Sequence, residues 1–199
     1  MKNHIKIYFT NKMTAWLIMV TLCLFTTFAT AQDSYKVQKA SVLLKGTSTL
    51  HDWEMKAEGF SCISLFQMEN NQVAHVKSLT LTIPVQTLKS GKGAMDKNAY
   101  SALKVEDHKQ ITYVITSSKV SGNKIICTGN LTIAGVTKPM EVESTYTVNT
   151  DNTIVCKTSK TFKMSEFNVE PPTFMFGSVT TGDEITMAFD LIFKRVNAL

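Results

Sequence analysis

Residues 185–193 read ITMAFDLIF, with an apolar side chain at every second position from Ile185 to Phe193. Successive side chains of a β-strand point to opposite faces of a sheet, so this period predicts a strand with one apolar face. The same alternation recurs at 79–83 and 140–148. A chain that repeats this pattern has to hide one face of every strand, and a sandwich or a closed barrel does so. The stretch therefore predicts an all-β fold.

Eight segments combine strand-like composition with flanking turn residues, and we predict strands at 35–46, 53–61, 73–84, 111–119, 124–134, 137–148, 153–164 and 184–194. Eight is also the number of strands whose closed barrel has an interior just wide enough for side chains or one small ligand. Residues 32–199 therefore suit a single all-β domain, either a sandwich or an eight-stranded barrel that could hold a ligand.

Two segments interrupt the period of two. Within 89–110, Met95, Ala99 and Leu103 follow helical spacing, which predicts one short amphipathic helix between the third and fourth strands. Segment 165–182 contains two adjacent prolines, which exclude a central strand, and several aromatic residues. Long loops of this kind are often lids. We expect this one to gate the barrel.

Residues 1–31 have the pattern of a secretory signal peptide. Three lysines precede an apolar run at 15–28, and Ala29-Thr30-Ala31 is a small-x-small cleavage site. This pattern predicts a periplasmic or secreted protein.

Removing the leader leaves 18 basic and 16 acidic residues, a net charge of +2, and Arg195 is the only arginine. This composition argues against a nucleic-acid partner.

Three cysteines remain after the leader: Cys62, Cys127 and Cys156. In a simple meander Cys127 and Cys156 would lie two strands, about 10 Å, apart, which is beyond disulfide reach. We expect buried structural thiols.

Trp53 opens the second predicted strand, and we expect it to close one barrel end as part of the core.

The stretch from Gly129 to Pro139, GNLTIAGVTKP, resembles the signature of the YceI-like family of exported, lipocalin-like, polyisoprenoid-binding proteins. The segments 41–53, 103–115 and 182–185 are similar to further family segments in the same order. The resemblance implies an all-β, eight-stranded antiparallel, lipocalin-like barrel over residues 32–199, with a packed helix and a long isoprenoid in its lumen. It also implies a carrier rather than an enzyme.

The resemblance and the strand alternation together nominate a lumen and gate. The candidate ligand-binding residues are Ile111, Tyr113, Ile115, Leu131, Ile133, Tyr146, Phe162, Met164, Phe167, Phe174, Phe176, Met187, Phe189 and Leu191. We expect an apolar or lipid ligand, such as a polyisoprenoid or isoprenoid quinone, and no other cofactor. Contact with a membrane would be transient, and the oligomeric state, a dimer included, stays open.

Four alternatives remain beside this interpretation. The same side chains could fill an ordinary core, which would leave a surface interaction module. His51, His75 and His108 could form a zinc site of a small hydrolase, although their spacing does not favour it. The lysines at 89–109 could meet a diphosphate head group, although a solvated helix face is the commoner case. An outer-membrane barrel would need its apolar faces outside.

Overall fold

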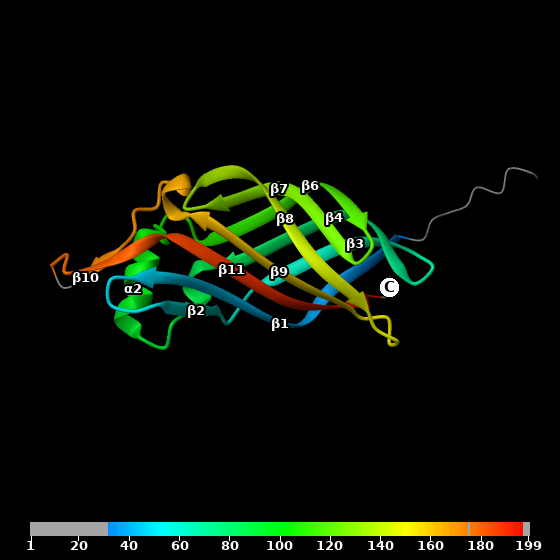
Figure 1. The fold of residues 1–199 in the computed structure, drawn as a ribbon, viewed down its shortest axis with the longest axis horizontal. Helices are drawn as coiled ribbons and strands as arrows, with labels where there is room; N and C mark the ends of the chain where they lie inside the picture. Colours follow the sequence, from blue (N-terminus) through cyan, green and yellow to red (C-terminus); the bar gives the residue numbers. More distant parts are fainter. Residues whose placement is uncertain (1–31, 175, 197–199) are drawn as a thin grey trace, which may run out of the picture. The chain divides into compact units, whose positions relative to one another are not determined.

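The computed structural model describes residues 32–174 and 176–196 (Figure 1), so the predicted signal peptide lies outside the described residues. Eight long strands form the barrel: β1 (Gln32–Ser48), β3 (Ser61–Glu69), β4 (Gln72–Pro84), β6 (Gln110–Ser121), β7 (Lys124–Ile133), β8 (Val136–Val148), β9 (Ile154–Lys163) and β11 (Val179–Val196). They follow one another around the barrel in the order β1-β3-β4-β6-β7-β8-β9-β11. Antiparallel pairing of β11 with β1 closes the ring. The predicted fold class is confirmed.

Shorter elements gather at one end of this barrel. They are β2 (Trp53–Ala57), the 3-10 helix η1 (Val85–Thr87), β5 (Leu88–Lys89), α2 (Gly93–Ala102), the 3-10 helix η2 (Met164–Phe167) and β10 (Thr173–Phe174). Helix α2 lies between β5 and β6, within the segment where helical spacing predicted it. Figure 1 shows α2 lying across the barrel end. None of the described helices has the length and hydropathy needed to cross a membrane.

The second predicted strand is wrong in its extent. Strand β2 ends at Ala57, and a separate long strand, β3, takes the place in the barrel that segment 53–61 was expected to fill. Strand β3 is hard to recognise because two of its central residues break the alternation of polar and apolar faces. Ser64 is fully buried and donates to the Ser78 carbonyl, whereas Ile63 is 47% exposed. A period of two cannot be recognised when a polar residue points inward and an apolar one outward.

Segment 165–182 is more ordered than a single loop. It contains most of η2 and all of β10, and β11 already begins at Val179, five residues before the predicted start. Strand β10 is only two residues long and pairs with β11 alone. The two prolines precede it directly, which agrees with the rule that proline is confined to edges and strand ends.

The family-like stretch 129–139 forms the turn of the β7–β8 hairpin and the strand ends that flank it. Its turn residues, Ala134 and Gly135, both have positive φ, as a two-residue hairpin turn requires. A side chain at Gly135 would also overlap the ring of His108, because its Cβ would lie 2.4 Å from that ring. The glycine is therefore required by both backbone and packing.

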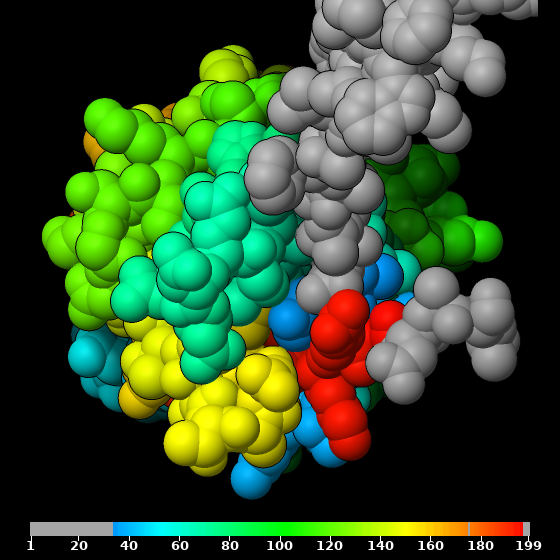
Figure 2. All heavy atoms as spheres, turned by 90° about the vertical axis from the view of Figure 1, so that its right-hand side faces the viewer, coloured from blue at the N-terminus to red at the C-terminus, as the bar shows by residue number. Residues whose placement is uncertain are grey.

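The barrel end remote from α2 is filled by aromatic residues. The rings of Tyr35 and Phe66 meet edge to face at a centroid distance of 5.2 Å, and Phe66 meets Phe193 at the same distance. Figure 2 looks onto this end and shows the β3–β4, β6–β7 and β8–β9 turns crowded over it. Any opening suited to a ligand therefore has to be sought elsewhere.

Strands β8 and β9 are paired over only part of their length. Their hydrogen-bonded register runs only from Ser144 opposite Thr158 to Val148 opposite Ile154, so the first half of β8 has no partner in β9 among the described residues.

The inward faces of the strands are mostly apolar and the outward faces mostly polar. That arrangement is the reverse of an outer-membrane barrel.

Candidate functional site: an apolar bore in two parts

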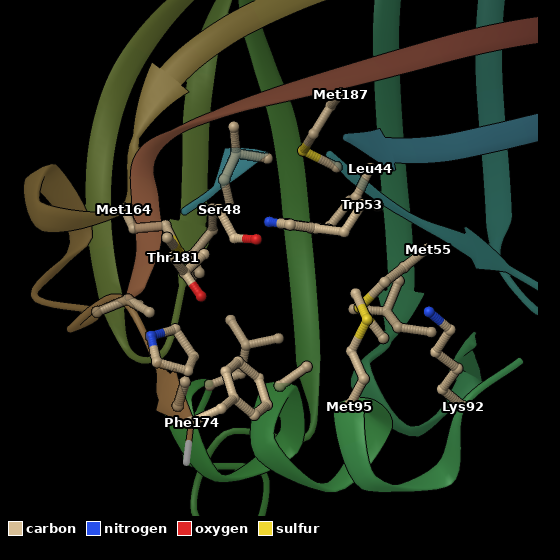
Figure 3. A pocket seen from close by; sticks show the side chains of 18 of the residues that line it. Leu44, Ser48, Trp53, Met55, Lys92, Met95, Met164, Phe174, Thr181 and Met187 are labelled. Atoms are coloured by element: carbon tan, nitrogen blue, oxygen red, sulfur yellow. The ribbon is translucent and has the colours of Figure 1, made fainter. Parts of the chain in front are cut away.

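The larger cavity lies beside α2 and has a volume of about 360 Å³. This volume is at the lower end of the range of about 300–1,000 Å³ that is usual for small-molecule sites. Its wall is overwhelmingly apolar, and Figure 3 shows Met55 from β2 and Met95 from α2 among its lining side chains. We call it the first cavity. Methionine suits such a wall because its side chain adapts to irregular shapes.

Trp53 is partly buried against the core and also forms part of the wall of the first cavity. Its indole Nε1 donates a hydrogen bond of 3.0 Å to the Thr47 carbonyl. The ring lies against Gly46 on β1, where an added Cβ would come within 2.3 Å of it. Gly46 therefore makes the space that lets Trp53 present a face to the cavity.

A few polar side chains mark the rim of the first cavity: Ser48, His51, Lys92 and Thr181. Lys92 and His51 are exposed. The neighbouring Lys89 does not line the cavity, because its Nζ donates to the Tyr100 hydroxyl at 2.7 Å, and this hydrogen bond raises the pKa of Lys89. Lys97, Lys104 and Lys109 are exposed, as expected of a solvated helix face.

Helix α2 is fixed over the first cavity by a buried carboxylate. Asp96 accepts hydrogen bonds from the Ser90 amide at 2.8 Å and from the Ser90 hydroxyl at 2.6 Å. Burial acts to raise the pKa of Asp96, but the Ser90 hydrogen bonds and the Lys89 charge outweigh it and hold that pKa below its usual value. Asp96 thereby ties the first turn of α2 to the preceding loop.

A second carboxylate fixes the opposite wall. Asp183 on β11 accepts hydrogen bonds from the Ser165 amide at 2.8 Å and the Ser165 hydroxyl at 2.6 Å, and these bonds lower the pKa of Asp183. Ser165 belongs to η2, whose Phe167 is fully buried and lines the first cavity. This link holds an aromatic part of the wall in place.

A smaller cavity of about 90 Å³ lies farther along the bore, and we call it the second cavity. It faces the stretch where β8 and β9 are not paired, with Met140 and Val142 on one side and Lys160 on the other. The Tyr113 hydroxyl reaches across its wall and donates to the Cys127 and Met140 carbonyls at 3.0 and 3.2 Å. Its polar group is thus satisfied by backbone.

The three cysteines are free thiols, as the sequence led us to expect, and all three are buried. They also share one space, because each of them lines the second cavity. Burial, with a smaller contribution from the neighbouring thiols, raises the pKa of Cys62 to about 12. Burial likewise raises the pKa of Cys127 to about 11 and that of Cys156 to about 12. Such thiols are poor nucleophiles because the reactive thiolate is scarce at neutral pH.

The structure brings most of the predicted lining residues to one of the two cavities. The first cavity takes Ile133, Met164, Phe167 and Phe174, and the second takes Tyr113, Leu131, Phe189 and Leu191. Ile111, Phe162 and Met187 line both. Three predicted residues line neither: Ile115 packs on the core, Tyr146 is buried with its hydroxyl donating to the Val73 carbonyl, and Phe176 is fully exposed.

The sequence did not nominate the lining residues of β1, β2, α2 and the chain next to them, among them Leu44, Leu50, Trp53, Met55, Met95, Ala99, Ala102 and Leu103. The signal was present for α2, because Met95, Ala99 and Leu103 had already been recognised as one helical face. What periodicity could not tell is that this face covers the barrel end instead of packing on its outside.

Nothing among the described residues forms a metal site of at least three His, Cys, Asp or Glu side chains. His51 lies at the cavity rim, His75 shares a hydrogen bond of 3.2 Å with the Ser118 hydroxyl, and His108 lies against Gly135. The three histidines proposed for zinc are therefore not brought together.

Comparison with known proteins agrees with this architecture. Protein YceI of Salmonella arizonae is 28% identical over 131 residues, which cover 61% of this chain and 65% of that protein, so the chain spans less than two thirds of its length. The crystal structure of BcnA from Burkholderia cenocepacia has a TM-score of 0.66 at 24% identity, covering 77% of this chain and 95% of that one.

A polyisoprenoid binding domain from Saccharophagus degradans, implicated in plant cell wall breakdown, has a TM-score of 0.64 at 9% identity. The match covers 81% of this chain and 98% of that domain. At such identities the structures show a shared fold only. The family model of the YceI-like domain matches residues 29–193, which is most of the chain. The chain belongs to the YceI-like family.

Proposed function

We propose that this protein is an exported carrier that holds the apolar chain of an isoprenoid, such as a polyisoprenoid or an isoprenoid quinone, in the first cavity. The observation that carries the proposal is a cavity of about 360 Å³ with an almost wholly apolar wall at one end of a closed barrel. A hydrocarbon chain gains about 0.8 kcal/mol for each methylene-sized group that leaves water. The wall therefore offers affinity without any polar contact.

The state of the buried polar groups supports an apolar ligand. No buried side-chain nitrogen or oxygen among the described residues lacks a hydrogen-bond partner. A site built for a polar ligand would present such groups to it, because an unpaired buried polar atom costs free energy until the ligand satisfies it. The bore therefore has no unsatisfied buried side-chain group, among the described residues, that would need a polar ligand. The Saccharophagus degradans domain of the same fold is described as binding polyisoprenoid.

The rim provides a place for a polar head group. Lys92 and His51 stand there with the hydroxyls of Ser48 and Thr181. An exposed lysine at a cavity mouth can offset a negative head group, although its contribution in water is modest. We propose that the tail enters first and that the head stays at this rim.

We also propose that ligand exchange occurs during transient contact with a membrane. Two large apolar side chains near this end are exposed: Leu50, which lines the cavity mouth, is 68% exposed, and Phe176, in the β10–β11 turn, is fully exposed. The loop that carries Leu50 is tied to the start of β11, which follows the turn with Phe176, because the Thr49 amide donates to the Thr180 carbonyl at 3.0 Å. Such residues could enter a bilayer surface while the cavity faces it.

Export is supported by the pattern of residues 1–31 described above. We expect the protein made by its own cells to begin at Gln32 and to be found in the periplasm or the medium. The intact mass of that protein gives the position of its first residue. A mass that includes the first 31 residues would contradict cleavage.

The carrier function is tested by extracting freshly purified protein with organic solvent and identifying the extracted molecules by mass spectrometry. We expect an isoprenoid in near-stoichiometric amount, or uptake of an added isoprenoid by protein that arrives empty. Repeated preparations that yield no lipid and take up none would contradict the proposal.

A further inference from the structure

Three side chains line both cavities: Ile111, Phe162 and Met187. They are only 3%, 8% and 4% exposed, respectively, so each is packed on most sides. Since no other described residue lines both cavities, these three stand between the two spaces. The bore is thus divided by side chains rather than by the backbone.

The positions of these residues in the barrel explain how they can meet. Ile111 is on β6 and Met187 is on β11, which lies four strands away in the eight-stranded ring, so the two strands face each other across the bore. Phe162 is on β9, beside β11, with Ile185 as its register partner. The divider therefore reaches inward from opposing walls.

The three side chains that divide the bore differ in conformational freedom. The ring of Phe162 meets the ring of Phe167 edge to face at 5.5 Å, and Phe167 is fully buried, so Phe162 is supported from behind. Ile111 is β-branched and has few rotamers. Met187 is unbranched and flexible. Met187 is therefore the member whose removal would join the two cavities.

The volumes translate into chain lengths. An apolar cavity of about 150 Å³ holds benzene, which has six carbons. On that scale the first cavity, at about 360 Å³, holds about 14 carbons, close to three isoprene units. The second cavity, at about 90 Å³, would add about four carbons, or one further unit.

We propose that Ile111, Phe162 and Met187 form a gate that limits the chain buried in the bore to about three isoprene units. The inference rests on the proposed function, because it assumes that the first cavity holds an isoprenoid tail. While the gate is closed, isoprene units beyond the third remain outside the mouth of the first cavity, and they gain no burial. The gate therefore sets how affinity depends on chain length.

Linear prenols of two, three, four and five isoprene units test the gate in the wild-type protein. We expect affinity to rise at least about tenfold from two to three units, because the added carbons leave water. From three to five units we expect a change of less than about threefold. Calorimetry, or displacement of a fluorescent apolar probe, measures the four dissociation constants.

The variant Met187→Ala opens the gate, and we expect it to move the plateau from three units to four. The matched control is Leu191→Ala, two inward positions further along the same strand, which enlarges only the second cavity and should keep the wild-type plateau. Circular dichroism shows whether the alanine variant folds. If it does not, Met187→Val replaces it as the variant that opens the gate.

A wild-type affinity that keeps rising by the same factor up to five units would overturn the gate and leave the carrier proposal intact. The same holds if Met187→Ala and Leu191→Ala shift the plateau equally. A protein that binds none of the four prenols contradicts the carrier proposal itself, so the two failures are distinguishable.

Discussion

The three thiols show how an ionisable residue can serve as part of an apolar wall. Cys62, Cys127 and Cys156 lie on three different strands, yet all point into the second cavity. Their pKa values are raised because burial penalises the thiolate. In this protonated form a thiol behaves as a small apolar side chain. Their number and spacing in the sequence indicated free thiols, but only the barrel shows that they share one space.

Raised thiol pKa values predict a loss of stability in alkali. Unfolded cysteines release their protons near pH 9, whereas the folded thiols hold theirs to about pH 11–12, so the unfolded state binds fewer protons in between. The contribution of these thiols to stability should therefore be constant up to about pH 8.5 and fall above it. By linkage, the raised pKa of each thiol lowers the free energy of unfolding by about 1–2 kcal/mol between pH 8.5 and 10.5.

Urea unfolding of the wild type and of Cys156→Ala at these two pH values measures the effect. Comparing the pH dependence of each protein removes the constant cost of the truncated side chain. We expect the free energy of unfolding of the variant to fall by about 1–2 kcal/mol less than that of the wild type over this range. Equal losses would show that the Cys156 thiol ionises normally in the folded protein.

Glycine and tryptophan mark the limit of sequence reasoning at this scale. Trp53 was recognised as important, but its role depends on Gly46, whose missing side chain makes room for the indole ring. The two residues face each other across β1 and β2, in register at Gly46 and Trp53. No local pattern connects them, since the pairing of β1 with β2 exists only in the folded sheet.

Among the elements, η2 illustrates a wall held by one hydrogen-bonded link. The Ser165 amide and hydroxyl both donate to Asp183. We predict that Asp183→Ala increases amide hydrogen exchange at residues 165–167 at least several-fold while the remaining barrel is unchanged, because this amide loses its acceptor. Asp190→Ala is the control, since Asp190 is an exposed carboxylate on the same strand.

The pH dependence of this link has a defined direction. Because its pKa is lowered in the folded protein, Asp183 contributes stability above its usual pKa of 3.8, and that contribution is lost as the pH falls through the folded value. Relative to the intrinsic exchange rate at each pH, the protection of amides 165–167 should thus fall under acid conditions in the wild type but not in Asp183→Ala. An identical exchange profile in all three proteins would contradict the role of the link.

The rim elements carry the prediction about membrane contact. Serine at both Leu50 and Phe176 should slow transfer of a prenol from vesicles to the protein at least several-fold, because both exposed apolar contacts with the bilayer are lost. Affinity for dispersed prenol should change less than about threefold, since most of the cavity wall is intact. The control is serine at Ile63 and Val114, two exposed apolar residues on barrel strands.

Transfer is followed by stopped-flow fluorescence with a labelled prenol. If the rim variant and the control variant take up ligand equally fast, uptake does not depend on contact through Leu50 and Phe176. A slow rim variant with weakened affinity would instead indicate damage to the cavity mouth.

Strand prediction succeeded where each face of a strand is chemically uniform and failed where it is not. Strand β11 follows its apolar alternation from Ile185 to Phe193, and its partner β9 was located almost to the residue. Strand β3 was missed because it buries Ser64 and exposes Ile63. A buried hydroxyl with a carbonyl partner costs little, but hydropathy counts it as polar.

For the molecule as a whole, the number of strands was predicted even though one strand was misplaced. Eight long strands close a ring through β1 and β11, and the family match covers residues 29–193. The division of the bore could not be predicted, because it depends on which inward residues of β6, β9 and β11 meet. Alternation assigns a residue to a face but gives neither its height in the barrel nor its partner across it.

The apolar first cavity is the central element of this account, and binding by a filled variant tests it most directly. Ala99 on α2 lines the cavity, whereas Lys97 on the same helix is exposed. Phenylalanine at position 99 would occupy space that the ligand needs, and phenylalanine at position 97 would not. Both variants can be compared with the wild type by thermal unfolding to confirm that they fold.

The measurement is the dissociation constant of a three-unit prenol for the wild type, Ala99→Phe and Lys97→Phe. We predict that Ala99→Phe weakens binding at least about tenfold, because several methylene-sized groups lose their place in the cavity. Lys97→Phe should bind as the wild type does. Equal affinity of all three proteins, or binding by none, would contradict the claim that this cavity holds an apolar chain.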